Sequence, residues 1–226
     1  MQAPRHIRSF VLRAGRLTPA QERALEQHWR SYGIDLGDDP LDLDAIFQRR
    51  APRCLEIGFG TGEVIGSLAE NHPHIDYLGI EVHRPGVGRL LLRASHSNMR
   101  NLRVICHDAV DILKYKLADE SFDEILVFFP DPWHKKRHHK RRLIDTAFVA
   151  SAAAKLRRGG VLRIATDWQD YAQQILSVCN ANASLDSLSA DRTCVPRPQF
   201  RPQTRFEQRG ERLGHSVWDF AYGKLP

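Results

Sequence analysis

The sequence predicts an α/β fold built around a doubly wound, mostly parallel sheet. From residue 53 to about residue 182, five short apolar runs alternate with helical patterns, which is the rhythm of successive strand–helix units. The chain has 226 residues, of which 42% are hydrophobic, and this length is sufficient for one large domain with a sizeable core. We therefore expect an α/β domain over residues 53–226, preceded by an N-terminal region, residues 1–52.

The N-terminal region contains a basic arm, a helix and an acidic connector. Residues 1–17 include several arginines but no acid and no periodicity. Thr18 is a good N-cap for a helix that would end at Gly33. Residues 34–52 are acidic and rich in turn-forming residues, and we expect one short helix among them near Leu43–Phe47.

The α/β region shows the elements in regular order. After the fifth helix the rhythm is lost, and the last 44 residues end in an apolar segment at 217–222. The strands are expected at 54–57, 77–80, 102–106, 122–129 and 161–166. The helices are expected from the glycine loop to about 71, through 89–94, near 109–115, over 144–156 with a stop at Gly159 and Gly160, and from 168 to about 182.

One short stretch, the basic segment (residues 134–142), accounts for the charge of the protein. It holds six Lys/Arg and three His without an acid, whereas the whole chain has 33 Lys/Arg against 27 Asp/Glu, a net charge of +6. Removing the six cations leaves 27 against 27, so the excess is local. A local basic patch predicts a polyanionic partner, and the alternative is a solvated helix start.

Other classes are disfavoured by the composition. No apolar run approaches the roughly 20 residues of a membrane helix, and the N-terminus lacks the apolar stretch of a signal peptide, although its arginines also suit a transit peptide. The four cysteines have no CxxC spacing and are expected to be reduced thiols. We expect a cytoplasmic protein.

An acid stands at or near the carboxyl end of every predicted strand. Ligands of doubly wound sheets bind at this edge, so the set predicts a ligand that is cationic or rich in hydroxyls and amines. Asp108 and Asp167 taken singly also suit turns or caps. Asp131 is bracketed by Pro130 and Pro132, which stiffen the backbone and aim its carboxylate. The five acids are Glu56, Glu81, Asp108, Asp131 and Asp167.

A glycine loop follows the first strand, with Gly58, Gly60 and Gly62 in alternate positions. A dinucleotide fingerprint requires its third glycine where this chain has Glu63, and a carboxylate there would repel a pyrophosphate. Glu81, 21 residues after Gly60, suits paired ribose hydroxyls. Together with the acids, the loop fits S-adenosylmethionine, which has a sulfonium, an amino group and a ribose but no phosphate.

The motifs resemble those of a known family. The segments LEIGFG at 55–60 and GIEVH at 79–83 resemble the cofactor site of class I methyltransferases. Three further segments resemble the bacterial tRNA (guanine-N7)-methyltransferases: FFPDPWHK at 128–135, ATDW at 165–168 and TRFE at 204–207. The similarity runs from about Ser9 to the C-terminus in the same order.

The resemblance implies a methyltransferase domain over 53–226 that transfers a methyl group from S-adenosylmethionine to N7 of a guanine in the variable loop of tRNA. It assigns Glu56, Glu81, Asp108 and Asp131 to the cofactor, beside Gly58, Gly60 and Gly62, with Asp131 also at the active site. It assigns Lys135, Asp167, Thr204, Arg205, Phe206 and Glu207 to the RNA substrate.

Guanine N7 has an in-plane lone pair and no proton, so its attack requires no strong base. We expect the Asp131 carboxylate to stabilise the positive charge that moves during transfer, with Asp167 as a second orienting acid. Trp133 either stacks on a base or packs at the pocket rim. No metal is expected, because no acid lies among His134, His138 and His139. Phosphate contacts are expected from Lys135, Lys136, Arg137, Lys140, Arg141 and Arg142.

Three other functions are compatible with parts of this pattern. An exocyclic-amine methyltransferase would use a similar Asp-Pro motif, although Trp133 stands where that motif has its second proline. A non-catalytic RNA-binding protein would not need all the acids. A nicotinamide dehydrogenase would need a different glycine spacing. The protein is expected to act as a monomer or homodimer.

Overall fold

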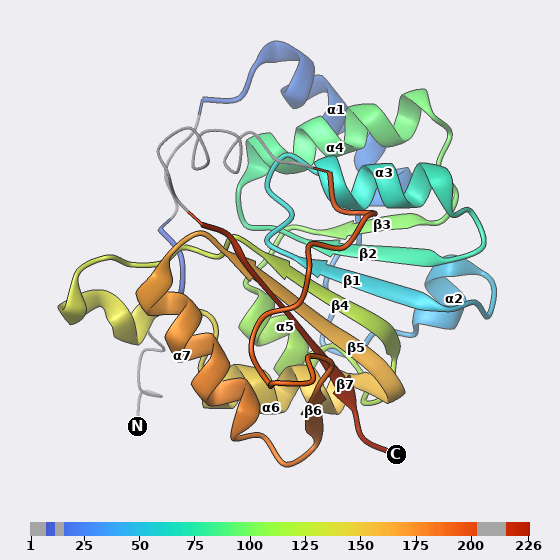
Figure 1. The fold of residues 1–226 in the computed structure, drawn as a ribbon. Helices are drawn as coiled ribbons and strands as arrows, with labels where there is room; N and C mark the ends of the chain where they lie inside the picture. Colours follow the sequence, from blue (N-terminus) through green and yellow to red (C-terminus); the bar gives the residue numbers. More distant parts are fainter. Residues whose placement is uncertain (1–7, 12–15, 203–215) are drawn as a thin grey trace, which may run out of the picture.

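A seven-stranded sheet lies between two layers of helices in the computed structural model, which describes residues 8–11, 16–202 and 216–226 (Figure 1). The strand order is β3-β2-β1-β4-β5-β7-β6. The first five strands are parallel, and β7 runs antiparallel between β5 and β6. The predicted doubly wound, mostly parallel fold is therefore confirmed. The strands are β1 (Arg53–Ile57), β2 (Asp76–Ile80), β3 (Leu102–Ile105), β4 (Phe122–Phe128), β5 (Leu156–Thr166), β6 (Leu185–Ser187) and β7 (Trp218–Lys224).

Each face of the sheet has its own apolar core. Helices α1, α3 and α4 pack on one face, and α2, α5, α6 and α7 pack on the other (Figure 1). Successive residues of β1 alternate between the two cores, with Cys54 in one and Leu55 in the other. None of the helices in the described ranges is long and apolar enough to cross a membrane. The helices are α1 (Pro19–Tyr32), α2 (Leu43–Phe47), α3 (Glu63–Asn71), α4 (Arg84–His96), α5 (Ala109–Tyr115), α6 (Thr146–Lys155) and α7 (Gln169–Asn180).

The N-terminal helix α1 begins as the sequence predicts. The Thr18 hydroxyl accepts from the backbone N–H of Gln21, and the Gln21 side chain accepts from the N–H of Thr18, which completes a capping box. At the other end, the Tyr32 hydroxyl donates to the Ala94 carbonyl of α4 at 3.0 Å. The helix therefore belongs to the layer that covers the first half of the sheet.

The helix expected over 144–156 is shorter than predicted. It spans Thr146–Lys155, with the Asp145 side chain accepting from the Phe148 N–H at 2.8 Å, so Ile144 precedes it. Leu156 already belongs to β5, and Gly159, at φ 75°, lies inside that strand. The register between β4 and β5 shifts at this point, so the glycine pair marks a strand irregularity rather than a helix end.

The last two strands, β6 and β7, were not predicted from the sequence. In β7, Trp218, Phe220 and Tyr222 pack against one core, which is a two-residue period within the apolar segment at 217–222. The segment escaped assignment because it does not continue the strand–helix alternation. It returns antiparallel to β5 instead.

A substitution at Gly86 tests how α4 supports the glycine loop. A Cβ at Gly86 would overlap with the carbonyl oxygen of Gly60, so α4 and the loop can approach only because this position is glycine. We expect Gly86→Ala to lower the free energy of unfolding by about 1–3 kcal/mol, measured by urea denaturation. Gly37→Ala is the matched control, because its Cβ meets nothing within 4 Å. Equal losses at both positions would contradict the packing role.

Candidate active site

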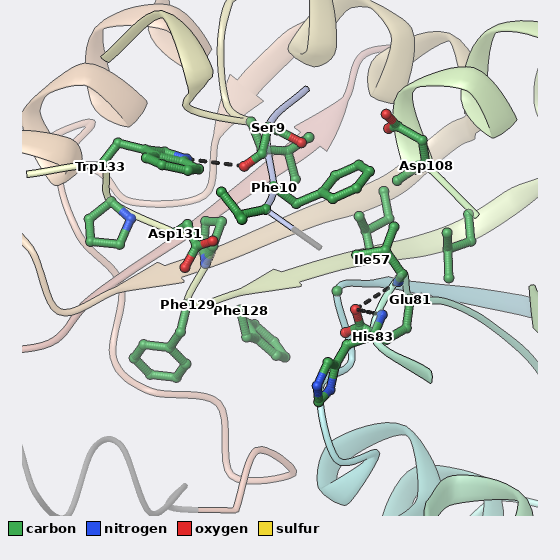
Figure 2. A pocket seen from close by; sticks show the side chains of 18 of the residues that line it. Ser9, Phe10, Ile57, Glu81, His83, Asp108, Phe128, Phe129, Asp131 and Trp133 are labelled. Carbon is green, nitrogen blue, oxygen red and sulfur yellow. Dashed lines mark hydrogen bonds between the residues drawn. The ribbon is translucent and has the colours of Figure 1, made fainter. Parts of the chain in front are cut away.

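A pocket of about 700 Å³ opens beyond the carboxyl ends of β1, β2, β3 and β4. Its wall includes Gly58, which follows β1. It also includes Glu81 after β2, Asp108 after β3 and Asp131 after β4 (Figure 2). The strand order reverses between β1 and β4, and doubly wound sheets bind ligands at such a switch point. Three of the five predicted acids therefore meet in one cavity.

The glycine loop has the backbone that only glycine adopts without strain. Gly58, Gly60 and Gly62 have φ of 72°, 57° and 74°. The Gly60 N–H donates to Glu81 Oε2 at 2.8 Å, so the loop is tied to the end of β2. Gly58 lies in the pocket wall, whereas Gly60 and Gly62 are not among the residues that line the pocket.

Glu81 has a structural task that its sequence position did not predict. Its other oxygen, Oε1, accepts from the backbone N–H groups of Val82 and His83 at 2.7 and 2.9 Å. With the bond from Gly60, one carboxylate satisfies three backbone donors. Glu81 thus joins two loops of the pocket while it faces the cavity.

Glu56, on β1, is 3% exposed and is not one of the residues that line the pocket. Its Oε2 has no hydrogen-bond partner among the described residues. Burial in this position, with a smaller contribution from the charge of Glu81, raises the pKa of Glu56 to about 8, although a backbone hydrogen bond from Ile65 opposes the shift. A buried carboxyl group that lacks a partner is a place where a cationic ligand would be stabilised.

Asp108 and Asp131 lie on opposite sides of the cavity (Figure 2). Asp108 is buried, and its Oδ1 accepts from the Val110 N–H at 3.0 Å, so it also caps α5. The cap interpretation is correct for Asp108 and does not remove it from the pocket. Asp131 is exposed to the cavity side and projects from the loop after β4.

The loop that holds Asp131 is strained at both ends. Phe129 and Trp133 have φ of 53° and 49°, the left-handed region that bulky residues rarely adopt. The Phe129 N–H donates to the Ala165 carbonyl at 2.8 Å, and the Pro132 carbonyl accepts from Arg142 Nε at 2.8 Å. Such strain persists only where surrounding contacts over-determine the backbone, and it is concentrated at functional sites.

Three residues of the N-terminal arm, Ser9, Phe10 and Val11, line the pocket, which the sequence did not indicate. Trp133 Nε1 donates to the Ser9 carbonyl and Arg141 Nη2 to the Phe10 carbonyl, each at 3.0 Å. Figure 2 shows Phe10 between Asp108 and Asp131. The Arg141 guanidinium lies 4.2 Å from the Trp133 ring, so Trp133 packs at the rim. No periodic pattern marks residues 1–17, and the contacts depend on backbone carbonyls that any sequence has.

The basic segment divides into exposed and buried cations. Lys135, Lys136, Arg137 and Lys140 are exposed, the last three on a short 3-10 helix. Arg142 is 4% exposed, and its prediction as a phosphate contact is corrected, because its donors are used inside the protein.

The histidines of the basic segment do not form a metal centre with acids. Burial and the neighbouring cations Arg137 and Lys135 lower the pKa of His138. The His134 ring packs against Trp168 with centroids 4.1 Å apart. Within the described ranges, no group of three or more His, Cys, Asp or Glu side chains is placed to hold a metal ion.

One predicted RNA contact among the described residues, Asp167, is not in the pocket wall. Asp167 follows β5 and is half-buried. The prediction for Thr204, Arg205, Phe206 and Glu207 falls outside the described residues.

Known proteins with similar sequences decide the family. Residues 50–220 match a family model described as "Putative methyltransferase". The tRNA (guanine-N(7)-)-methyltransferase of Aeromonas hydrophila is 52% identical over 221 residues, which cover 98% of this chain and 93% of that protein. The protein of the same name from Neisseria gonorrhoeae is 50% identical, with 98% and 92% covered. This chain belongs to the tRNA (guanine-N(7)-)-methyltransferase family.

Solved structures with a similar fold include proteins that are named methyltransferases. The antibiotic-resistance methyltransferase Kmr aligns with a TM-score of 0.57 at 12% identity, covering 85% of this chain and 95% of its own. The 16S rRNA (adenine(1408)-N(1))-methyltransferase of Catenulisporales acidiphilia, solved with its cosubstrate SAM, gives 0.55 at 14% identity, covering 85% and 93%. At sequence identities this low, the similarity is evidence for the fold of this chain only.

The buried Glu56 carboxyl predicts an unusual dependence of stability on pH. Because its pKa is raised to about 8 in the folded state, the folded protein keeps a proton that the unfolded chain releases above its ordinary pKa of 4.5. This contribution to stability is full below about pH 4.5 and is lost as the pH rises toward 8, at roughly 1.4 kcal/mol per pH unit.

Urea unfolding of the parent and of Glu56→Gln at pH 5.5 and 8.5 measures this contribution. Gln does not titrate, so the variant should gain about 3 kcal/mol relative to the parent between the two pH values. Parallel pH profiles for the two proteins would contradict the burial account.

Proposed function

We propose that this protein transfers a methyl group from S-adenosylmethionine to N7 of a guanine in tRNA and so produces 7-methylguanosine. By family resemblance, the guanine lies in the variable loop. The observation that carries the proposal is the pocket that joins Glu81, Asp108 and Asp131 in a chain 52% identical to a tRNA (guanine-N(7)-)-methyltransferase.

The residues at the pocket fit S-adenosylmethionine. A cation bound near the buried Glu56 carboxyl would favour its charged form, and the positive-φ glycines shape the loop that enters the pocket wall at Gly58. Glu81 suits the ribose hydroxyls, and Asp108 suits an amino group. When bound, S-adenosylmethionine supplies the electrophilic methyl group. The residues proposed to hold it are Glu56, Gly58, Gly60, Gly62, Glu81, Asp108 and Asp131.

Asp131 acts by charge and position in this proposal. The acceptor nitrogen has a free lone pair and no proton, so the carboxylate has nothing to remove. Positive charge moves from the donor to the purine during transfer, and a fixed carboxylate stabilises that charge most when its position is set in advance. The strained and hydrogen-bonded loop around Asp131 supplies this preorganisation.

Transfer RNA is the proposed partner, met in the cytoplasm by a monomer or homodimer. Lys135, in the pocket wall, would reach the RNA nearest the reacting base, and Lys136, Arg137 and Lys140 would contact phosphates farther out. Asp167 and the residues Thr204, Arg205, Phe206 and Glu207 remain proposed substrate contacts.

The direct test is incubation of bulk tRNA with the protein and methyl-labelled S-adenosylmethionine, followed by mass analysis of the nucleosides. Label in 7-methylguanosine supports the proposal. Label in an N-methylated exocyclic amine would move the reaction to the competing methyltransferase class. No incorporation, with intact tRNA binding, would favour a non-catalytic RNA-binding protein.

Replacing Asp131 by Asn tests the role of its charge. The substitution keeps the shape and one acceptor oxygen, so we expect single-turnover methyl transfer to slow by about 10²–10³-fold. Cofactor affinity, measured by calorimetry, controls for a general loss of the pocket. A steep rise of the parent rate near pH 7, absent in the Asn variant, would show that Asp131 takes a proton.

The exposed cations of the basic segment predict a salt-dependent affinity. Replacing Lys136, Arg137 and Lys140 together by Ala should weaken tRNA binding and reduce the slope of log affinity against log salt by roughly 0.7–0.9 for each lost phosphate contact. Lys114→Ala, on α5, is the control and should keep the parent slope. A triple variant with the parent slope would show that these side chains only face solvent.

A further inference from the structure

Arg142, the last cation of the basic segment, points into the protein. Its Nε donates to the Pro132 carbonyl at 2.8 Å, and its Nη1 donates to Gln174 Oε1 at 2.8 Å. Its Nη2 donates to Asp170 Oδ2 at 2.5 Å. The side chain is 2% exposed, so the guanidinium cannot reach a phosphate without breaking these bonds.

Helix α7 supplies most of the surface that holds this guanidinium. The group lies 4.8 Å from the centre of the Tyr171 ring, and its Nη2 is 3.1 Å from His139 Nε2. The same helix also binds the chain after the basic segment. The Tyr171 hydroxyl accepts from the Ile144 N–H at 2.9 Å, and Gln174 Nε2 donates to the Ile144 carbonyl at 2.8 Å. The segment is therefore fixed on α7 at two successive points.

The bond to Pro132 acts on the strained part of the Asp131 loop. The Pro132 carbonyl belongs to the peptide unit that enters Trp133, whose φ is 49°. A left-handed backbone at a bulky residue costs of order 1–3 kcal/mol and persists only if contacts hold it. Arg142 supplies such a contact one residue after Asp131. A planar guanidinium that binds a carbonyl, an amide and a carboxylate together fixes direction as well as distance.

We infer that Arg142 is a positioning residue: its buried guanidinium joins the Pro132 carbonyl to Asp170 and Gln174 of α7 and so holds the Asp131 loop in place. The inference rests on the proposed methyl transfer for its rate measurement only. It separates Arg142 from the exposed cations beside it. A phosphate contact requires only a positive charge, which Lys provides, whereas the three-way fork requires Arg.

The test compares Arg142→Lys with Arg157→Lys. Arg157 is a matched control, because it also binds a carboxylate, Asp123, and a backbone carbonyl, Glu120, at the far end of β4. At saturating tRNA, Arg142→Lys should slow single-turnover transfer by about 10–100-fold, since small displacements of a catalytic group have effects of this size. Its tRNA affinity and salt slope should equal those of the parent. Arg157→Lys should keep the parent rate.

A readout without activity keeps this inference separate from the proposed function. Hydrogen exchange of the peptide covering residues 129–135 should be at least several-fold faster in Arg142→Lys and unchanged in Arg157→Lys. Asp170→Asn is the second variant in case Arg142→Lys does not fold, because the Asp170 side chain is 58% exposed, and its loop exchange should also rise. A full parent rate in Arg142→Lys or unchanged loop exchange would overturn the inference. Absence of transfer by the parent itself would count against the proposed function alone.

Discussion

The parallel pairing of β1 with β4 is the constraint on which the rest of the site depends. Leu55 pairs with Ile125 and Glu56 with Leu126, so the two strands end side by side at the point where the strand order reverses. The glycine loop and the Asp131 loop continue from these ends and therefore face one cavity. Two hydrophobic cores, one on each face of the sheet, fix this pairing through alternate residues of the same strands.

Several features at the carboxyl ends of these strands lower the stability of the folded protein. Glu56 is buried with an oxygen that lacks a partner among the described residues, and Phe129 and Trp133 adopt a left-handed backbone. Each feature costs free energy in the absence of ligand. The compensation comes from fixed contacts outside the pocket, such as the Arg142 fork on α7. This is how a charge is preorganised near a reacting group: contacts from the rest of the fold hold the loop in a conformation that it would not keep alone.

The sequence predicted those parts of the site that depend on the type of side chain. It missed the parts that depend on where the backbone lies in the fold. Acids at strand ends located Glu81, Asp108 and Asp131 because parallel strands end at one edge. The N-cap at Thr18 was also predicted, because capping depends on the residue type at one position. The arm at Ser9 was not, since it uses carbonyl oxygens. Arg142 was predicted as a phosphate contact because a run of cations does not reveal which member is buried against a neighbouring helix. Strand β7 was missed because its pairing with β5 is non-local.

The central claim is that guanine N7 is the acceptor and that Asp131 serves it by fixed charge. The most direct measurement uses tRNA in which 7-deazaguanosine, with carbon in place of N7, replaces guanosine at the acceptor position. We predict normal tRNA binding and no detectable methyl transfer from S-adenosylmethionine, because the lone pair that attacks is gone while the exocyclic amine remains. Transfer to the substituted tRNA at the rate of the unmodified tRNA would contradict the claim and place the reaction on the amine.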